Sequence, residues 1–299
     1  MLCAGFGAFA QFPRVVSGRL VRLDSFPSRY VEKRHVDVLL PEGYKPGKRY
    51  DVLYMHDGQM LFDSATTWNK LSWDVDDVLA RLIRERKIRE VIVVGIWNSG
   101  AGRHADYFPQ KPFESLPKAV QDSLYGAVRG SGASVFQGKR VCSDDYLKFL
   151  VTELKPYIDS SFLTRKDRAH TFVAGSSMGG LISMYAICEY PEVFGGAACL
   201  STHWPGIFTM DNNPIPDAIF RYMSQHLPDP ATHRLYFDHG DQTLDALYPP
   251  LQRKADSVLA KKGYGPGSLL SRSFPGTDHS EGAWRARLEE PLVFLLKRK

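Results

Sequence analysis

Hydrophobic and polar residues alternate near the start of the chain in a pattern that predicts two β-strands. The alternation covers Val15 to Leu23 and His35 to Leu40. The following segment, Pro41 to Lys48, carries Pro, Gly and charged residues and separates these strands from the next apolar run. The sequence therefore predicts an antiparallel hairpin at the N-terminal side of the fold.

From about residue 50 onward, short apolar runs alternate with segments of helical spacing. An almost unbroken apolar run such as Val91 to Ile96 is typical of a parallel strand covered on both faces, whereas Trp73 to Arg86 gathers its apolar residues on one helical face. The expected strands are 50–56, 91–96, 171–174, 196–200, 234–239 and 269–274, and the expected helices are 73–86, 147–162, 181–189, 251–261 and 281–296. This alternation predicts an α/β fold with a mostly parallel central sheet and helices on both faces.

One segment, Asn98 to Ser143, breaks this rhythm because it shows no clear periodicity. It contains Pro109, Pro112 and Pro117 and a cluster of glycines between 126 and 138. Its aromatic residues distinguish it from a disordered linker, and connections of this length are usually functional. We therefore expect a lid-like or substrate-binding insertion at about 98–143.

Length, composition and charge narrow the class of protein. The chain has 299 residues, 43% hydrophobic and 24% charged, which is typical of globular proteins and compatible with one or two domains. No apolar run approaches the roughly 20 residues needed to cross a bilayer, so we expect no membrane partner. The net charge is +5, but Lys and Arg are scattered along the sequence, which argues against a nucleic-acid partner. The four cysteines show no zinc-binding spacing, and we expect no metal or other cofactor.

The first residues resemble the end of a signal peptide. Leu2 to Ala10 is apolar and small and ends in Ala8, Phe9 and Ala10, but the basic region that opens a full signal is missing. We interpret residues 1–12 as a truncated signal-peptide remnant. This predicts a periplasmic or secreted protein, with a cytoplasmic one as the alternative.

The chemistry-bearing motif is Gly175 to Gly179, which reads GSSMG and fits GxSxG. It follows the expected strand 171–174 and precedes the expected helix 181–189, which is where a nucleophile elbow belongs. Such a turn exposes the Ser177 hydroxyl and directs the Met178 N–H toward the same space. The sequence therefore predicts Ser177 as the nucleophile and Met178 as one oxyanion donor.

The base and the acid of a triad follow in the expected order. His279 lies just past the last expected strand and before the last helix, so it can reach back to the nucleophile. Asp245 and Asp241 both follow the strand 234–239; we prefer Asp245, which lies deeper in its loop, and keep Asp241 as the alternative. Asp238, within the strand, is interpreted as structural.

The second oxyanion donor is expected after the strand that ends at His56. The sequence there continues Asp57, Gly58, Gln59, and the glycine allows a sharp turn, so we assign the Gln59 N–H. His56 ends a buried strand and is interpreted as a structural hydrogen-bonding residue.

Several aromatic residues and one arginine are candidates for contacts with the substrate. Trp97, Tyr107, Phe108 and Trp204 could line an aromatic cleft that suits a hydroxycinnamoyl or sugar ester, or could simply pack in the core. Arg103 could favour an anionic or catecholate substrate, or could pair with Asp106 to brace its loop.

Taken together, these stretches resemble the putative esterase family of α/β hydrolases, which includes feruloyl and acetylxylan esterases, enterobactin-type siderophore esterases and mycolyltransferases. The resemblance runs from about residue 30 to the C-terminus and is carried above all by GSSMGG at 175–180 and HSEGAW at 279–284, with LYMHDGQMLFD, VIVVGIWN, RHADYFP and YFDHGDQTLDALY between 53 and 248. It implies an α/β-hydrolase sheet with Ser177 and His279 catalytic and with oxyanion donors at Gln59 and Met178. Family members often carry Gly-Thr at the position of Gly240 and Asp241.

The expected activity is hydrolysis of a carboxylic ester, as a small molecule or linked to a polysaccharide, through an acyl-enzyme and without a cofactor. A feruloyl or acetyl ester of a carbohydrate is preferred; a siderophore esterase, an acyltransferase and a non-catalytic carbohydrate-binding protein are the alternatives. Because Ser177, Asp245 and His279 must converge on one edge of one sheet, we expect residues 13–299 to form a single domain.

Overall fold

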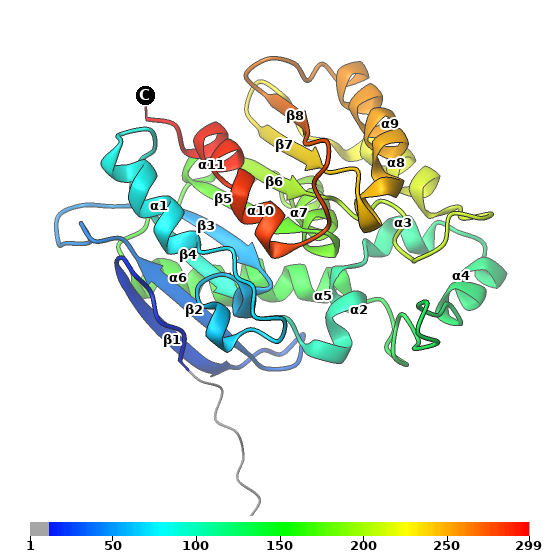
Figure 1. The fold of residues 1–299 in the computed structure, drawn as a ribbon, viewed down its shortest axis with the longest axis horizontal. Helices are drawn as coiled ribbons and strands as arrows, with labels where there is room; N and C mark the ends of the chain where they lie inside the picture. The colour runs from blue at the N-terminus through cyan, green and yellow to red at the C-terminus, as the bar shows by residue number, and fades with distance from the viewer. Residues whose placement is uncertain (1–11, 299) are drawn as a thin grey trace, which may run out of the picture.

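An eight-stranded sheet forms the frame of the molecule in the computed structural model, which describes residues 12–298 (Figure 1). The predicted signal remnant therefore lies almost entirely outside the described residues. The strand order is β1-β2-β4-β3-β5-β6-β7-β8. The strands are β1 (Arg19–Phe26), β2 (Arg34–Leu40), β3 (Asp51–His56), β4 (Val91–Ile96), β5 (Thr171–Ser176), β6 (Gly196–Leu200), β7 (Arg234–His239) and β8 (Leu269–Ser273).

Strand directions confirm the expected α/β arrangement. β1 pairs with β2 and β2 with β4 in antiparallel register, whereas all pairs from β4 and β3 to β8 are parallel. Within β3, Val52 and Tyr54 join the core on one face of the sheet and Leu53 and Met55 join the core on the other. Because both faces are covered, the inner strands are buried along almost their whole length and show no alternation of buried and exposed residues.

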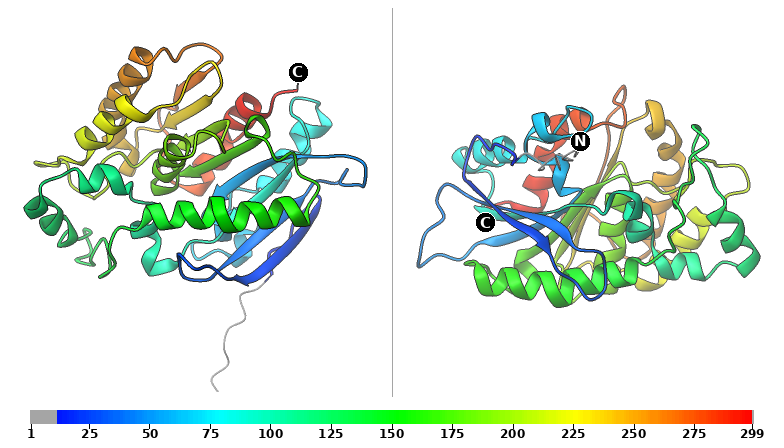
Figure 2. Two further views of the ribbon diagram at one scale, coloured as in Figure 1. Left: turned by 180° about the vertical axis from the view of Figure 1, so that it is seen from behind. Right: turned by 90° about the horizontal axis from the view of Figure 1, so that it is seen from below.

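The helices form layers on the two faces of the sheet. Figure 2 shows the long helical segment, residues 143–161, that crosses one of these faces. Its core partners on that face include residues of α2, α3, α7, α8 and α9, whereas α1, α10 and α11 contribute to the core of the opposite face. The helices are α1 (Val75–Arg84), α2 (Arg103–Tyr107), α3 (Gln110–Glu114), α4 (Lys118–Tyr125), α5 (Ser143–Lys148), α6 (Lys155–Ser161), α7 (Met178–Glu189), α8 (Ile215–His226), α9 (Tyr248–Lys261), α10 (Glu281–Arg287) and α11 (Glu289–Leu296). None of the helices in the described part of the chain is long and apolar enough to cross a membrane.

Three helical segments differ from the sequence prediction. The helix expected at 147–162 begins earlier, at Ser143, and Phe149–Leu154 between α5 and α6 has π-helical hydrogen bonding. The helix expected at 281–296 is divided into α10 and α11, because Pro291 has no N–H and its ring would collide with the carbonyl of Arg287 in a continuous helix. Helix α8 was not predicted.

The segment 98–143 is more ordered than its sequence suggests. It contains α2, α3 and α4, and its aromatic rings pack on one another, with Phe113 5.4 Å from Phe108 and 5.1 Å from Tyr125 between ring centroids. Phe108, Phe113 and Phe136 are buried in the core on the α5 and α7 side of the sheet. Its role as a lid stays a prediction.

Candidate active site

Ser177 lies at the tight turn between β5 and α7. Its backbone has φ 57° and ψ −121°, a conformation that residues other than glycine rarely adopt. The turn is closed enough that a Cβ on Gly175 would lie 2.7 Å from the backbone of Gly179. The flanking glycines therefore let the strand and the helix approach each other, as a nucleophile elbow requires.

His279 faces Asp245 from the loop between β8 and α10. Its Nδ1 lies 2.5 Å from Oδ1 of Asp245, whose side chain is completely buried. Asp241, the alternative acid, is only partly buried and accepts a hydrogen bond from the Gly276 N–H at 2.7 Å. The structure therefore brings Asp245, and not Asp241, against the histidine.

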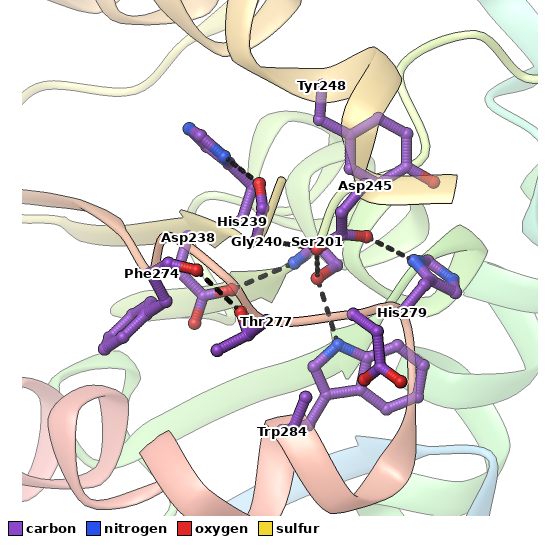
Figure 3. Close-up of polar contacts among 12 residues, drawn as sticks. Ser201, Asp238, His239, Gly240, Asp245, Tyr248, Phe274, Thr277, His279 and Trp284 are labelled. Atoms are coloured by element: carbon purple, nitrogen blue, oxygen red, sulfur yellow. Dashed lines mark hydrogen bonds and ion pairs between the residues drawn. The ribbon is translucent and has the colours of Figure 1, made fainter. Parts of the chain in front are cut away.

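The other oxygen of Asp245 is also occupied (Figure 3). Its Oδ2 accepts hydrogen bonds from the Ser201 hydroxyl and from the Gly240 N–H, both at 2.6 Å. Ser201 Oγ in turn accepts from the indole N–H of Trp284 at 3.0 Å. With both oxygens occupied, the carboxylate has a fixed orientation, and it stabilises the histidine tautomer whose Nδ1 carries the proton.

A buried ion pair lies beneath this network. Arg287 donates to Asp238 Oδ1 at 2.9 Å and to Ser201 Oγ at 2.7 Å, and its side chain is 3% exposed. Burial raises the pKa of Asp238, and the charge of Arg287 opposes that rise. Asp238 therefore has the structural role that was predicted for it, and it fixes Arg287 below the serine that orients Asp245.

The loops that carry the acid and the histidine are joined by backbone hydrogen bonds. The Thr277 carbonyl accepts from the N–H groups of Asp241 and Gln242, each at 3.1 Å, and the His279 N–H donates to Thr243 Oγ1 at 3.0 Å. The two loops are 35 residues apart in sequence, so the positions of the two carboxylates depend on these tertiary contacts.

Tyr248, His203 and Trp284 enclose the catalytic candidates and were not singled out from the sequence. The Tyr248 hydroxyl lies 2.8 Å from His203 Nδ1, and the rings of Tyr248 and Trp284 meet the His279 ring edge-on with centroids 5.8 and 5.0 Å away. Burial raises the pKa of Tyr248 well above its usual value and the charge of Asp245 raises it further, while a hydrogen bond with Ser177 opposes the rise. The phenol is therefore protonated beside the nucleophile.

Gln59 and Met178 lie on the same cleft as Ser177 and His279. Met178 is the first residue of α7, and Gln59 lies in the short 3-10 helix Gly58–Met60 that follows β3. A Cβ on Gly58 would lie 2.5 Å from the Gly95 carbonyl, so this turn depends on glycine to pack against β4. The arrangement fits the predicted oxyanion donors, whose role stays a prediction.

The cleft has a volume of about 490 Å³ and a mixed polar and aromatic lining. Trp68 stands at its rim with 83% of its surface exposed, and Leu71 is 43% exposed. Phe208, Trp73 and Trp284 add further aromatic surface. No pattern in the sequence distinguished Trp68, which lies in a polar loop.

The aromatic residues expected in the cleft lie elsewhere. Tyr107, Phe108 and Trp204 are completely buried, and Trp204 donates its indole N–H to Gln252. Trp97 is not part of the cleft lining and donates to Asp37. Trp97, Tyr107 and Trp204 therefore do not line the cleft in this structure, because their rings serve packing and hydrogen bonds within the protein.

Arg103 does line the cleft, but it pairs with Asp57 and not with Asp106. The two groups form a bidentate pair at 2.6 and 2.7 Å, and Asn98 donates to the same carboxylate. Burial alone would raise the pKa of Asp57, but Arg103 outweighs it and holds that pKa below its usual value. Asp106 instead contacts Arg34 at 3.2 Å.

Two buried histidines near the cleft are neutral. Burial lowers the pKa of His56 and that of His104 to about 3. His56 Nδ1 lies 2.8 Å from the Tyr146 hydroxyl, in line with its predicted structural role. Among residues 12–298 no group of three or more His, Cys, Asp or Glu side chains is arranged to hold a metal ion.

A family model and the sheet topology define the class of this protein. The model described as "Putative esterase" matches residues 28–295. The chain therefore belongs to the putative esterase family, and it has the α/β-hydrolase fold that was predicted.

Two curated relatives are similar in sequence. An endo-1,4-beta-xylanase/feruloyl esterase of Xylanibacter ruminicola is 27% identical over 273 residues, which cover 87% of this chain. YbbA of Bacillus subtilis, an uncharacterized protein, is 25% identical over 173 residues, or 57% of this chain. The aligned regions span 29% and 58% of these two relatives' lengths.

Solved structures share the fold at lower identity. A ferulic acid esterase has a TM-score of 0.64 at 19% identity and covers 93% of this chain and 98% of its own. An IroE-like serine hydrolase from Shewanella oneidensis has a TM-score of 0.65 at 20% identity, covering 92% and 78%. The enterobactin esterase from Shigella flexneri has a TM-score of 0.61 at 18% identity, covering 95% and 60%.

Replacing the buried Arg287 tests how much its ion pair with Asp238 contributes to the stability of the protein. Arg287→Met should lower the free energy of unfolding in urea by about 3 to 5 kcal/mol, because Asp238 loses its buried partner. Arg285→Met, on the same helix, removes an arginine whose side chain is 53% exposed and pairs with Asp74 at the surface, and should cost less than about 1 kcal/mol. Equal losses in the two variants would contradict this account.

Proposed function

We propose that this protein is a serine carboxylic-ester hydrolase that works through Ser177, His279 and Asp245. The observation that carries the proposal is the 2.5 Å contact between His279 Nδ1 and the buried Asp245, beside a cleft that Ser177 also lines. Family membership supports the reaction class.

The proposed chemistry is acyl transfer in two steps. His279 takes the proton of the Ser177 hydroxyl as the oxygen attacks the ester carbonyl, and Asp245 stabilises the imidazolium that forms. The N–H groups of Gln59 and Met178 stabilise the negative oxygen of the tetrahedral intermediate. The alcohol leaves with the proton from His279, and water then releases the acid from Ser177.

The preferred substrate is an ester with an aromatic acyl group or a sugar, such as a feruloyl or acetyl ester on a carbohydrate. Trp68 at the rim and Phe208 in the cleft offer planar surfaces on which such groups can stack. The similarity to the feruloyl esterase of Xylanibacter ruminicola points the same way.

A second candidate, an esterase for anionic substrates such as catecholate siderophores, is favoured by Arg129. This residue lines the cleft from the segment 98–143, and its guanidinium lies 4.7 Å from the centroid of the Phe208 ring. Burial and the charge of Arg103 lower its pKa, but an arginine stays protonated at neutral pH. In contrast to Arg103, Arg129 has no carboxylate partner among the described residues.

Ser177→Ala tests the nucleophile. Turnover of 4-nitrophenyl acetate and of methyl ferulate should fall by about four to six orders of magnitude, because the acyl-enzyme cannot form. A fluorophosphonate probe should label the unaltered protein and fail to label the variant. Turnover that persists in a variant with an unchanged melting temperature would exclude the proposed mechanism.

Asp245→Asn and Asp241→Asn form a matched pair that tests the acid. The first variant should lower kcat by about 10⁴, because an amide favours the wrong histidine tautomer. The second should stay within about twofold of the unaltered protein, since Asp241 bonds to the Gly276 N–H while Asp245 is the carboxylate that contacts His279. The reverse order of effects would move the acid to Asp241.

Arg129→Gln separates the two substrate classes. The ratio of kcat/KM for mono-4-nitrophenyl succinate to that for neutral 4-nitrophenyl acetate should fall about tenfold or more, because a hydrogen bond to a charged group is lost. Arg253→Gln, an exposed arginine on α9, removes the same charge and should leave the ratio unchanged. A constant ratio in Arg129→Gln would favour the neutral ester alone.

A further inference from the structure

Two adjoining hollows lie at the end of the sheet opposite to the catalytic cleft. The larger has a volume of about 1030 Å³ and the smaller about 410 Å³, and both are lined by Arg89, Arg165 and Arg298. The larger hollow includes His170, Gly195 and Arg234, which stand at the starts of β5, β6 and β7. Ser177 follows the end of β5, so one strand length, about 17 to 20 Å, separates the two regions. We call the combined lining of the two hollows the basic trough.

Positive charge dominates the basic trough. Among residues 12–298, its lining contains nine Lys and Arg residues and two carboxylates, and no Asp or Glu of that range lines the larger hollow. Both carboxylates are already paired: Asp51 contacts Arg89 at 2.7 Å and Arg165 at 3.2 Å, and Glu90 pairs with Lys48. The nine cations are Lys48, Arg49, Arg84, Arg86, Arg89, Arg165, Arg234, Lys297 and Arg298.

Arg234 shows most clearly that this charge is uncompensated. Its guanidinium donates to the Phe294 carbonyl at 3.0 Å and lies 5.6 Å from the centroid of the Phe172 ring, but it contacts no carboxylate in the described residues. Burial lowers its pKa and the nearby charge of Arg89 lowers it further, while the charge of Asp51, which is already paired with Arg89 and Arg165, opposes this to a smaller extent. A half-buried cation beside other cations is unfavourable unless an anion joins it, so the arrangement fits a site for an anionic ligand.

The shape and lining of the basic trough restrict the ligand. No Phe, Tyr or Trp of the described part of the chain lines either hollow, whereas single-stranded nucleic acids are usually held by base stacking on such rings. Arg234 is recessed, and the lining includes none of the exposed large hydrophobic residues of the described chain, so a flat lipid surface fits poorly. A narrow chain with charged groups along its length fits both hollows at once.

We propose that the basic trough binds an acidic polysaccharide, with its arginines contacting the carboxylates of uronic acid units. The choice of a polysaccharide among anionic chains rests on the proposed function, in which the ester is carried on a carbohydrate. Carboxylates suit this site because a guanidinium donates to them in a bidentate geometry. Binding here would hold a polymer on the enzyme while its ester groups exchange in and out of the cleft at the other end of the sheet.

The test uses polygalacturonate as the probe, with the full chain and its Ser177→Ala variant, at 50 mM and 300 mM NaCl. Both proteins should bind it, more weakly at the higher salt, because screening weakens contacts between charges. The double variant Lys297→Gln/Arg298→Gln and the single variant Arg234→Gln should each weaken binding about tenfold at 50 mM NaCl. Lys118→Gln/Lys254→Gln removes two exposed charges from α4 and α9 and should have little effect.

The possible results separate this inference from the proposed function. Ester hydrolysis without polygalacturonate binding overturns the inference alone, and binding without ester hydrolysis overturns the proposed function alone. Equal weakening in the Lys118 and Lys254 control, or tighter binding to a single-stranded oligonucleotide or to vesicles with 30% anionic lipid, would also overturn the inference. Circular dichroism and the melting temperature of Arg234→Gln show whether its loss of binding reflects unfolding, and the exposed double variant repeats the test without that risk.

Discussion

The orientation of the candidate triad depends on one buried carboxylate, that of Asp245. A buried carboxylate is stable only when hydrogen bonds and positive charge compensate for the water that it has lost. Here Ser201, Gly240 and His279 bond directly to it, and Arg287 lies 3.9 Å away behind Ser201. Ser201 follows β6 and Gly240 follows β7, while His279 precedes α10 and Arg287 is its last residue. A single side chain thus joins the separate loops at the C-terminal edge of the sheet.

This constraint extends from the site into the fold. Arg287 can reach Ser201 only because α10 packs on the sheet, and α10 is a short, separate helix since Pro291 ends its run. Trp284 on the same helix bonds to Ser201 and covers one edge of His279. Helix α10 thus supplies two of the hydrogen bonds that hold Ser201 against Asp245.

The two ends of the parallel strands have different electrostatic character. At the catalytic end, Arg103 is neutralised by Asp57 and the histidines His56 and His104 are kept neutral by burial, so few free charges face the cleft. At the other end, arginines from distant parts of the chain gather with few carboxylates among them. The net charge of the chain is only +5, but its positive charges are unevenly distributed over the surface.

The sequence alone determined the α/β architecture, the elbow at Ser177 and the position of His279, because periodic burial and glycine-dependent turns are local properties that neighbouring residues specify. Only the tertiary structure decided that Asp245, not Asp241, meets the histidine. It also put Trp68 at the cleft in place of Trp97, Tyr107 and Trp204, paired Arg103 with Asp57, and gathered scattered arginines into one basic trough. These outcomes depend on how loops tens of residues apart pack and satisfy each other's polar groups, which no local pattern of residues encodes.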